Sequence, residues 1–87
     1  MAARITINPN ADGELEIWLN PEGRDMLVKE LQGLSETNDH FHLGPSTFGE
    51  VEISNRPYRS NDRVLQYGKI LFRTKAWDAE YFPHVMG

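Results

Sequence analysis

Two histidines have the spacing of metal ligands in this sequence, and two glutamates follow them in the next segment. His40 and His42 are two residues apart in an alternating segment, so on a strand both rings would lie on the same side. Glu50 or Glu52, in the next alternating segment, could then complete a site of nitrogen and oxygen donors. A structural pair of histidines hydrogen-bonded to these glutamates explains the same residues. We expect this second arrangement, with no bound metal and no cofactor.

Carboxylates on neighbouring strands are the other candidates for chemistry. Glu14 and Glu16 could face Glu50 and Glu52, but acid–base catalysis also needs a pocket and a perturbed pKa. The segment 44–49 lacks the lysine of a phosphate-binding loop, and no serine is flanked by the glycines of an esterase elbow. We therefore predict that the chain is not an enzyme, with a small metal-dependent enzyme as the less favoured alternative.

The composition is that of one small folded unit. The chain has 87 residues, of which 39% are hydrophobic and none is cysteine, so disulfides and thiolate sites are excluded. We expect a single domain over residues 1–87, with a core at about 3–73 and a C-terminal tail at 74–87. Neither a membrane-spanning apolar run nor a secretion signal is present in the sequence, which predicts a cytoplasmic protein without membrane contact.

The charge balance argues against nucleic acid as a partner. Nine Lys and Arg against thirteen Asp and Glu give a net charge of −4, which would repel phosphates. Arg56, Arg59 and Arg63 form a local basic patch with Tyr58, which could in principle stack a nucleotide. A solvated loop is the interpretation we favour for this patch, and no nucleic acid is expected.

The N-terminal half predicts a hairpin followed by a helix. Segments 4–7 and 14–19 alternate with period two and are separated by turn residues. A helix is expected over 21–35, because Asn20 is a good N-cap and Pro21 suits the first helical position.

The C-terminal half predicts three more strands. Segments 39–43 and 50–54 alternate again and are expected to form a second hairpin, and 65–73 is the last strand. The polar segment 55–64 predicts a long loop, and 77–83 a tail with a helical turn.

These elements predict an α+β fold in the order β-β-α-β-β-β. We expect a mainly antiparallel sheet of four to five strands with one helix packed on one face. The expected core residues of the sheet are Ile5, Ile7, Leu15, Ile17, Leu19, Phe41, Leu43, Val51, Ile53, Ile70 and Phe72, facing Leu27, Leu31 and Leu34 of the helix.

The opposite face of this sheet is the predicted binding surface. Alternation places on it Glu14, Glu16, Trp18, His40, His42, Glu50, Glu52, Lys69, Leu71 and Arg73. Aromatic and arginine anchors among acids are typical of protein interfaces. A partner or a second copy could cover Trp18, or the tail residues Trp77, Tyr81 and Phe82 could fold back onto it. The predicted partner-binding residues are Glu14, Glu16, Trp18, His40, His42, Glu50, Glu52, Tyr58 and Arg59.

A family resemblance adds a role to this binding surface. Gly13-Glu-Leu-Glu-Ile-Trp-Leu-Asn-Pro-Glu-Gly23, the leucine-rich helix and Asp39-His-Phe-His-Leu-Gly-Pro45 resemble the small immunity proteins of bacterial polymorphic toxin systems, most closely the family numbered thirty-two. The resemblance covers residues 13–54. It implies a cytoplasmic, non-enzymatic α+β protein that binds and blocks a toxin made by the same cell or by a kin cell. A homodimer of unknown role is the alternative.

Overall fold

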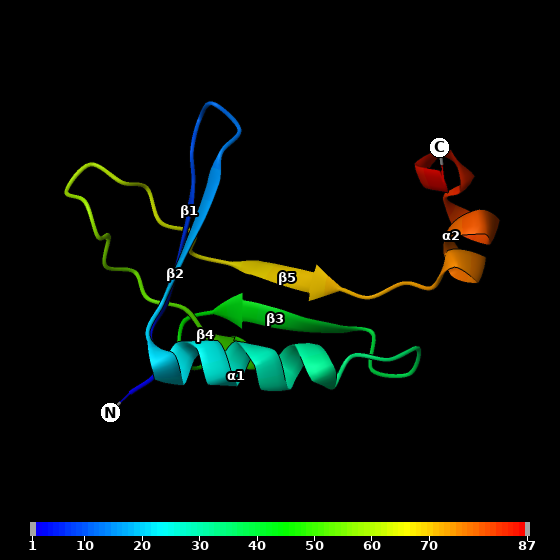
Figure 1. The fold of residues 1–87 in the computed structure, drawn as a ribbon, viewed down its shortest axis with the longest axis horizontal. Coiled ribbons are helices and arrows are strands. Elements are labelled where there is room, and N and C mark those ends of the chain that lie inside the picture. The colour runs from blue at the N-terminus through cyan, green and yellow to red at the C-terminus, as the bar shows by residue number, and fades with distance from the viewer. Residues whose placement is uncertain (1, 87) are drawn as a thin grey trace.

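The computed structural model describes residues 2–86, whose strands form two sheets rather than one. The elements are β1 (Ile5–Pro9), β2 (Leu15–Leu19), α1 (Pro21–Gln32), β3 (His40–Gly44), β4 (Val51–Glu52), β5 (Gly68–Leu71), α2 (Lys75–Tyr81) and the short 3₁₀ helix η1 (Pro83–Met86). In Figure 1 the β1–β2 hairpin stands at one end, α1 runs alongside β3, and α2 lies at the far end. The predicted α+β class is confirmed, whereas the single sheet of four to five strands with one helix is wrong.

The first hairpin is confirmed, and its register defines its two faces. β1 and β2 pair antiparallel, with Ile5 opposite Leu19, Ile7 opposite Ile17 and Thr6 opposite Trp18. Odd-numbered side chains therefore share one face of the hairpin, and even-numbered side chains share the other. We call these the odd face and the even face.

The second sheet has the order β4-β3-β5, and the hairpin predicted for its first two strands is wrong. β3 and β4 pair in parallel, through Leu43 with Val51 and Gly44 with Glu52, while β5 pairs antiparallel to β3. The short connection folds back over β3, where a Cβ at Gly49 would lie 2.5 Å from the His42 carbonyl oxygen. Only glycine permits this close approach of the connection to β3.

The helix α1 begins where the sequence predicts. Asn20 caps it, because its side-chain oxygen accepts a hydrogen bond from the Gly23 amide at 2.7 Å, and Pro21 occupies the first turn. The helix ends at Gln32 rather than at 35. Among the residues 2–86, α1 is the longest helix, and no helix has the length and apolar content needed to cross a membrane.

The core forms where the odd face of β1 meets the second sheet. Its buried side chains are Ile5, Ile7, Phe41, Leu43, Val51 and Ile53, with Leu27, Leu34, Leu65 and Ile70 packed against them. All of these except Leu65 were expected in the core. Hydrogen bonds from the Ser54 amide to the Ile5 carbonyl and from the Leu65 amide to the Ile7 carbonyl, both 2.7 Å, attach the later chain to β1.

Five residues predicted for the core are exposed instead. Leu15, Ile17 and Leu19 of β2 are 57%, 48% and 40% exposed, and Leu31 and Phe72 are also exposed. β2 lies outside β1, so its apolar side chains extend past the edge of the core. Leu31 is one turn after the half-buried Leu27 on the same side of α1, but it lies near the end of the helix and is not among the residues packed against the core.

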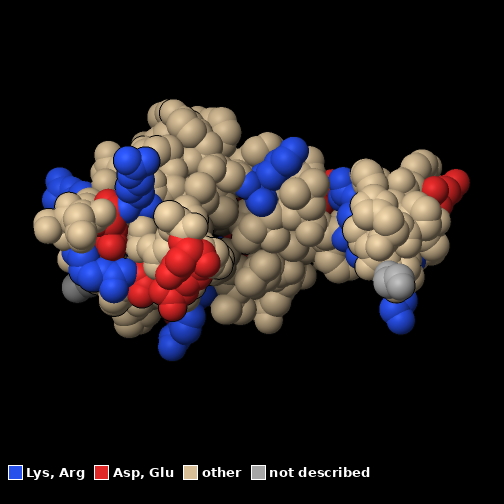
Figure 2. Space-filling model, turned by 90° about the horizontal axis from the view of Figure 1, so that it is seen from above, with Lys and Arg blue, Asp and Glu red and all other residues tan. Residues whose placement is uncertain are grey.

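The C-terminal segment 75–86 stands apart from both sheets. Figure 1 shows α2 and η1 beyond the end of β5, and Figure 2 shows them as a separate lobe. Trp77 packs against Tyr81 and Phe82 of the same segment, with ring centroids 4.8 and 5.3 Å apart. The predicted helical turn is therefore confirmed, but the tail does not cover Trp18.

Candidate functional site

Trp18 is covered by the loop that follows β4. Tyr58, in the middle of the segment 55–64, stacks on Trp18 with ring centroids 4.4 Å apart and an interplanar angle of 11°. Such stacks between large rings are favourable beyond the area they bury. The loop predicted to be solvated is thus held against the even face of the hairpin. In Figure 1 it lies beside the hairpin at the end of the molecule opposite α2.

Arg59 connects this loop to β2 through a cation–π contact and a salt bridge. Its guanidinium carbon lies 5.6 Å from the centre of the Trp18 ring, and Nη2 donates to the Glu16 carboxylate. Nε donates to Asp62 at 3.1 Å within the loop. The hydrogen bonds to Asp62 and then to Glu16 raise the pKa of Arg59 above its usual value. We call Glu16, Trp18, Tyr58 and Arg59 the hairpin–loop cluster.

Buried polar atoms lie on the even face near this cluster. Thr6 and Asn8 are each only 1% exposed, and Asn8 Nδ2 donates to Glu16 at 3.1 Å. Within residues 2–86, Thr6 Oγ1, Asn8 Oδ1 and Trp18 Nε1 have no hydrogen-bond partner. A buried polar group without a partner is unfavourable by about 1–3 kcal/mol. These three atoms lie beneath the even face, so their unmet hydrogen bonds destabilise it without being accessible to a partner.

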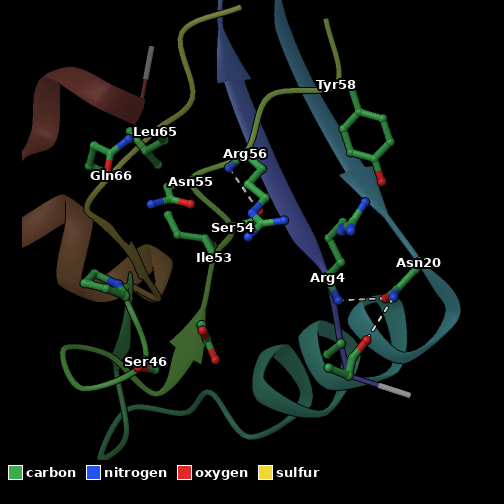
Figure 3. Close-up of a pocket in the computed structure, with 14 residues that line it drawn as sticks. Arg4, Asn20, Ser46, Ile53, Ser54, Asn55, Arg56, Tyr58, Leu65 and Gln66 are labelled. Carbon is green, nitrogen blue, oxygen red and sulfur yellow. Dashed lines mark hydrogen bonds between the residues drawn. The ribbon is translucent and has the colours of Figure 1, made fainter. Parts of the chain in front are cut away.

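A cleft of about 710 Å³ opens beside Tyr58. Figure 3 shows its lining, with Arg4 and Tyr58 near one another and Arg56 on the loop. The Arg4 guanidinium carbon lies 5.8 Å from the Tyr58 ring centre, and the Arg4 amide donates to Asn20 Oδ1 at 2.8 Å. Glu52 also lines the cleft. The cleft therefore combines apolar surface with charged groups of both signs.

The histidines lie on the second sheet, away from this cluster. The rings of His40 and His42 are 5.1 Å apart, on one side of β3 as the sequence predicts. His42 Nδ1 lies 3.4 Å from Glu50, while His40 Nδ1 lies 2.8 Å from Asp39. The expected pairing of a histidine with a glutamate is present for His42 and Glu50, and Asp39 takes the corresponding place beside His40.

Two carboxylates of this region have lowered pKa values. The backbone amide of His42 donates to Glu50 at 2.7 Å, and this hydrogen bond is the main cause that lowers the pKa of Glu50. The hydrogen bond with His40 lowers the pKa of Asp39, and Arg73 at 2.9 Å adds to the effect. Within the described residues, no three His, Asp or Glu side chains converge as metal ligands would.

Several acidic groups of the surface have basic neighbours. Figure 2 shows red and blue side chains close together at the end of the molecule opposite the lobe formed by α2 and η1. Glu16 and Asp62 pair with Arg59, and Asp39 pairs with Arg73. The acidic sheet face expected from alternation is therefore partly neutralised by basic neighbours.

The predicted binding residues fall into two groups instead of one face. Glu16 and Trp18 meet Tyr58 and Arg59 in the hairpin–loop cluster, and His40, His42 and Glu50 meet on the second sheet. Glu14 is exposed at the start of β2, where it accepts a hydrogen bond from Asn10, and Glu52 lines the cleft. A single continuous surface is wrong because the strands belong to two separate sheets.

Sequence reasoning missed Arg4 and Asn20 as neighbours of Tyr58. Arg4 has the same parity as Thr6, so alternation alone would place it on the even face with Trp18. Asn20 was identified only as a helix cap, although its side chain also bonds the Arg4 amide. In comparisons with known proteins, no family model, no curated protein and no solved structure matches this chain.

Proposed function

We propose that this chain is a non-enzymatic protein-binding module whose role is to bind and neutralise a bacterial toxin in the cytoplasm. The observation that carries the binding role is the hairpin–loop cluster, in which Tyr58 and Arg59 stack against Trp18. The toxin-neutralising role is supported by the resemblance of residues 13–54 to immunity proteins.

The cluster has the composition of an interface hot spot. Trp, Tyr and Arg contribute most of the binding energy in many protein complexes. Tyr58 is 45% exposed, and the Arg59 side chain is 49% exposed, so both can reach a partner. Their contacts with Trp18 and Glu16 restrict their rotamers before binding, which lowers the entropy lost when a partner docks.

The charges favour a partner of mixed charge. Arg59 is shared between Glu16 and Asp62, and Arg4 and Arg56 line the adjoining cleft together with Glu52. A partner with alternating charges would complement this pattern, and complementarity raises the association rate and selects the partner. The overall charge of −4 adds a weaker attraction for a basic toxin.

The proposal is tested by a paired capture and protection experiment. The tagged chain is used to retrieve proteins from the cell that encodes it, and each retained protein is then expressed alone in a bacterial host. We expect one retained protein to arrest growth, and co-expression of this chain to restore it. A retained protein that is harmless would leave a binding module without an immunity role.

The cluster is tested by variants in the same experiment. The double variant Tyr58→Ala, Arg59→Ala should lose most of the retained partner and the protection. Arg63→Ala changes an exposed arginine of the same loop and serves as the matched control, which should keep both. Equal retention by the wild type and the double variant would place the binding surface elsewhere.

A further inference from the structure

The outer edge of β2 is the feature of this fold that the proposed function does not use. In the hairpin, the Asn20 amide donates to the Arg4 carbonyl at 3.2 Å, and the Asn10 amide donates to the Glu14 carbonyl at 2.8 Å. Even-numbered pairs are therefore the hydrogen-bonded pairs of this antiparallel ladder. The amides and carbonyls of Leu15, Ile17 and Leu19 consequently point outward, away from β1.

Outward-pointing backbone groups of β1 form hydrogen bonds with later segments of the chain, whereas those of β2 form none within the described residues. The Ile5 and Ile7 carbonyls accept hydrogen bonds from the Ser54 and Leu65 amides. Within the described residues, β2 pairs only with β1, and no backbone hydrogen bond reaches the outward groups of Leu15, Ile17 or Leu19. β2 is thus an open edge strand of five residues.

The side chains of this edge are also suited to pairing. Leu15, Ile17 and Leu19 lie on the odd face, and all three are exposed. Natural edge strands are usually protected by lysine, proline or a bulge. The segment Leu15–Leu19 has no lysine, proline or bulge, since its five residues pair one to one with β1, and its one charged side chain, Glu16, is paired with Arg59.

The exposed area of the chain is large enough to include a missing interface. The accessible surface is 6561 Å², whereas a folded monomer of this mass exposes about 5,200 Å². The excess of about 1,300 Å² is larger than the ~800 Å² that one partner contributes to a standard interface. The radius of gyration of 14.8 Å is likewise above the value of about 12 Å expected for a chain of this length. The protruding C-terminal lobe accounts for part of both differences.

We propose that β2 pairs with β2 of a second copy of this chain, antiparallel and about a two-fold axis at Ile17. This register places Leu15 opposite Leu19 of the second copy and Ile17 opposite itself. All outward amides and carbonyls then bond across the axis, and the apolar side chains form one cluster on the odd face. The two hairpins become one four-stranded sheet without a free β2 edge.

A second copy fits this edge because the strand is self-complementary. Its sequence is apolar at both ends and at the centre, so inversion about Ile17 matches apolar with apolar. It also brings Glu16 opposite Trp18 and avoids placing two carboxylates directly opposite each other. Such isologous contacts are the commonest way in which small soluble chains assemble. This inference does not rest on toxin binding.

The first test measures mass against concentration. Sedimentation equilibrium of the wild type should show a reversible species of twice the 10.0 kDa chain mass. Ile17→Lys places two like charges at the axis and should weaken the dimer by at least about tenfold. Val28→Lys is the matched control. Val28 lies on α1, outside the proposed interface, and its exposed fraction of 43% is similar to the 48% of Ile17. Val28→Lys should leave the dimer unchanged.

The second test determines which residues of the two β2 strands are paired in the dimer. The chain has no cysteine, and two residues in a hydrogen-bonded antiparallel pair have Cα atoms about 5.5 Å apart, within disulfide range. Ile17→Cys should therefore form a disulfide-linked dimer under mild oxidation, whereas Val28→Cys should not. In hydrogen exchange, the amides of Leu15, Ile17 and Leu19 should become protected as the concentration rises.

The outcomes separate this inference from its alternatives. A chain that stays monomeric at all concentrations overturns it, and so does a dimer that is lost in Val28→Lys but kept in Ile17→Lys. Amides of β2 that become protected only when a captured protein is added would show that the edge belongs to that partner. Failure of the growth-protection experiment would leave the dimer untouched, because that experiment probes the even face and its loop.

Discussion

The two strands of the hairpin have the same alternation and are paired residue by residue, but they lie in different surroundings. Ile5 of β1 is 0% exposed, while its partner Leu19 of β2 is 40% exposed. β1 bonds to later chain segments along its second edge, and β2 has no such neighbour within the described residues. An amphipathic strand pattern thus requires a covered face without specifying whether this chain or another supplies the cover.

The largest expected effect compares the two strands directly. Ile5→Ala should lower the free energy of unfolding by about 2–5 kcal/mol, the usual range for a fully buried aliphatic side chain. Ile17→Ala should lower it by about 1 kcal/mol or less in the monomer, because its side chain is half exposed. Urea unfolding at a concentration where the chain is monomeric measures both. Equal losses would mean that β2 is as buried as β1.

A smaller effect tests whether the loop covers the even face of β2. Tyr58→Ala should lower the free energy of unfolding by about 1–2 kcal/mol, through lost area and lost stacking. With Trp77→Phe as background, Trp18 is the only tryptophan, and its emission should shift to longer wavelength in the variant. Tyr81→Ala in the C-terminal lobe is the control and should leave the emission of Trp18 unchanged. An unshifted emission in Tyr58→Ala would show that the stack does not shield Trp18.

Helix α1 also contains one apolar side chain that packs on the core and one that is exposed. Leu31→Ala should lower the free energy of unfolding by less than about 1 kcal/mol, because Leu31 is 43% exposed. The sequence alone predicts a larger loss, of about 2–5 kcal/mol, for a buried leucine. Leu27→Ala, at a half-buried position packed on the core, should have the greater effect. Thermal and urea unfolding distinguish the two positions, and a larger loss for Leu31 would show that the last turn of α1, rather than the turn of Leu27, packs on the core.

The smallest expected effect concerns an exposed carboxylate of the second sheet. The hydrogen bond with His40, supported by Arg73, lowers the pKa of Asp39 below its ordinary value of 3.8. A lowered pKa in the folded state contributes stability above the unfolded value, and this contribution is lost as pH falls through the folded value. Between about pH 5 and 2, the free energy of unfolding of Asp39→Asn should therefore decrease slightly less with falling pH than that of the wild type. Asp25→Asn on α1 is the control. If the free energy of unfolding depends on pH in the same way in Asp39→Asn and the wild type, Asp39 does not contribute to the acid sensitivity.

Local signals made several features of this fold predictable. The start of α1 follows from Asn20 and Pro21, because a cap and a fixed φ act on the nearest backbone only. The first hairpin follows from period-two alternation around a turn, which is also a local property. Within the candidate site, alternation predicts that Glu16 shares a face with Trp18 and that His40 shares a face with His42.

The contact between Trp18 and Tyr58 was not predictable in the same way. The two residues are far apart in the chain, and the polar loop that carries Tyr58 has no periodicity that would assign it to a face. The parallel pairing of β3 and β4 also escaped prediction, because alternation within two segments does not specify their relative direction.

The sequence by itself determined where α1 begins, which side chains alternate, and that both strands of the first hairpin have one apolar face. Only the tertiary structure decided which of those faces are covered. Burial depends on the direction in which each long connection returns, and that direction follows from packing between residues distant in sequence. β1 lies between two neighbours and is buried, whereas β2 has one neighbour and keeps its apolar side chains and outward backbone groups exposed.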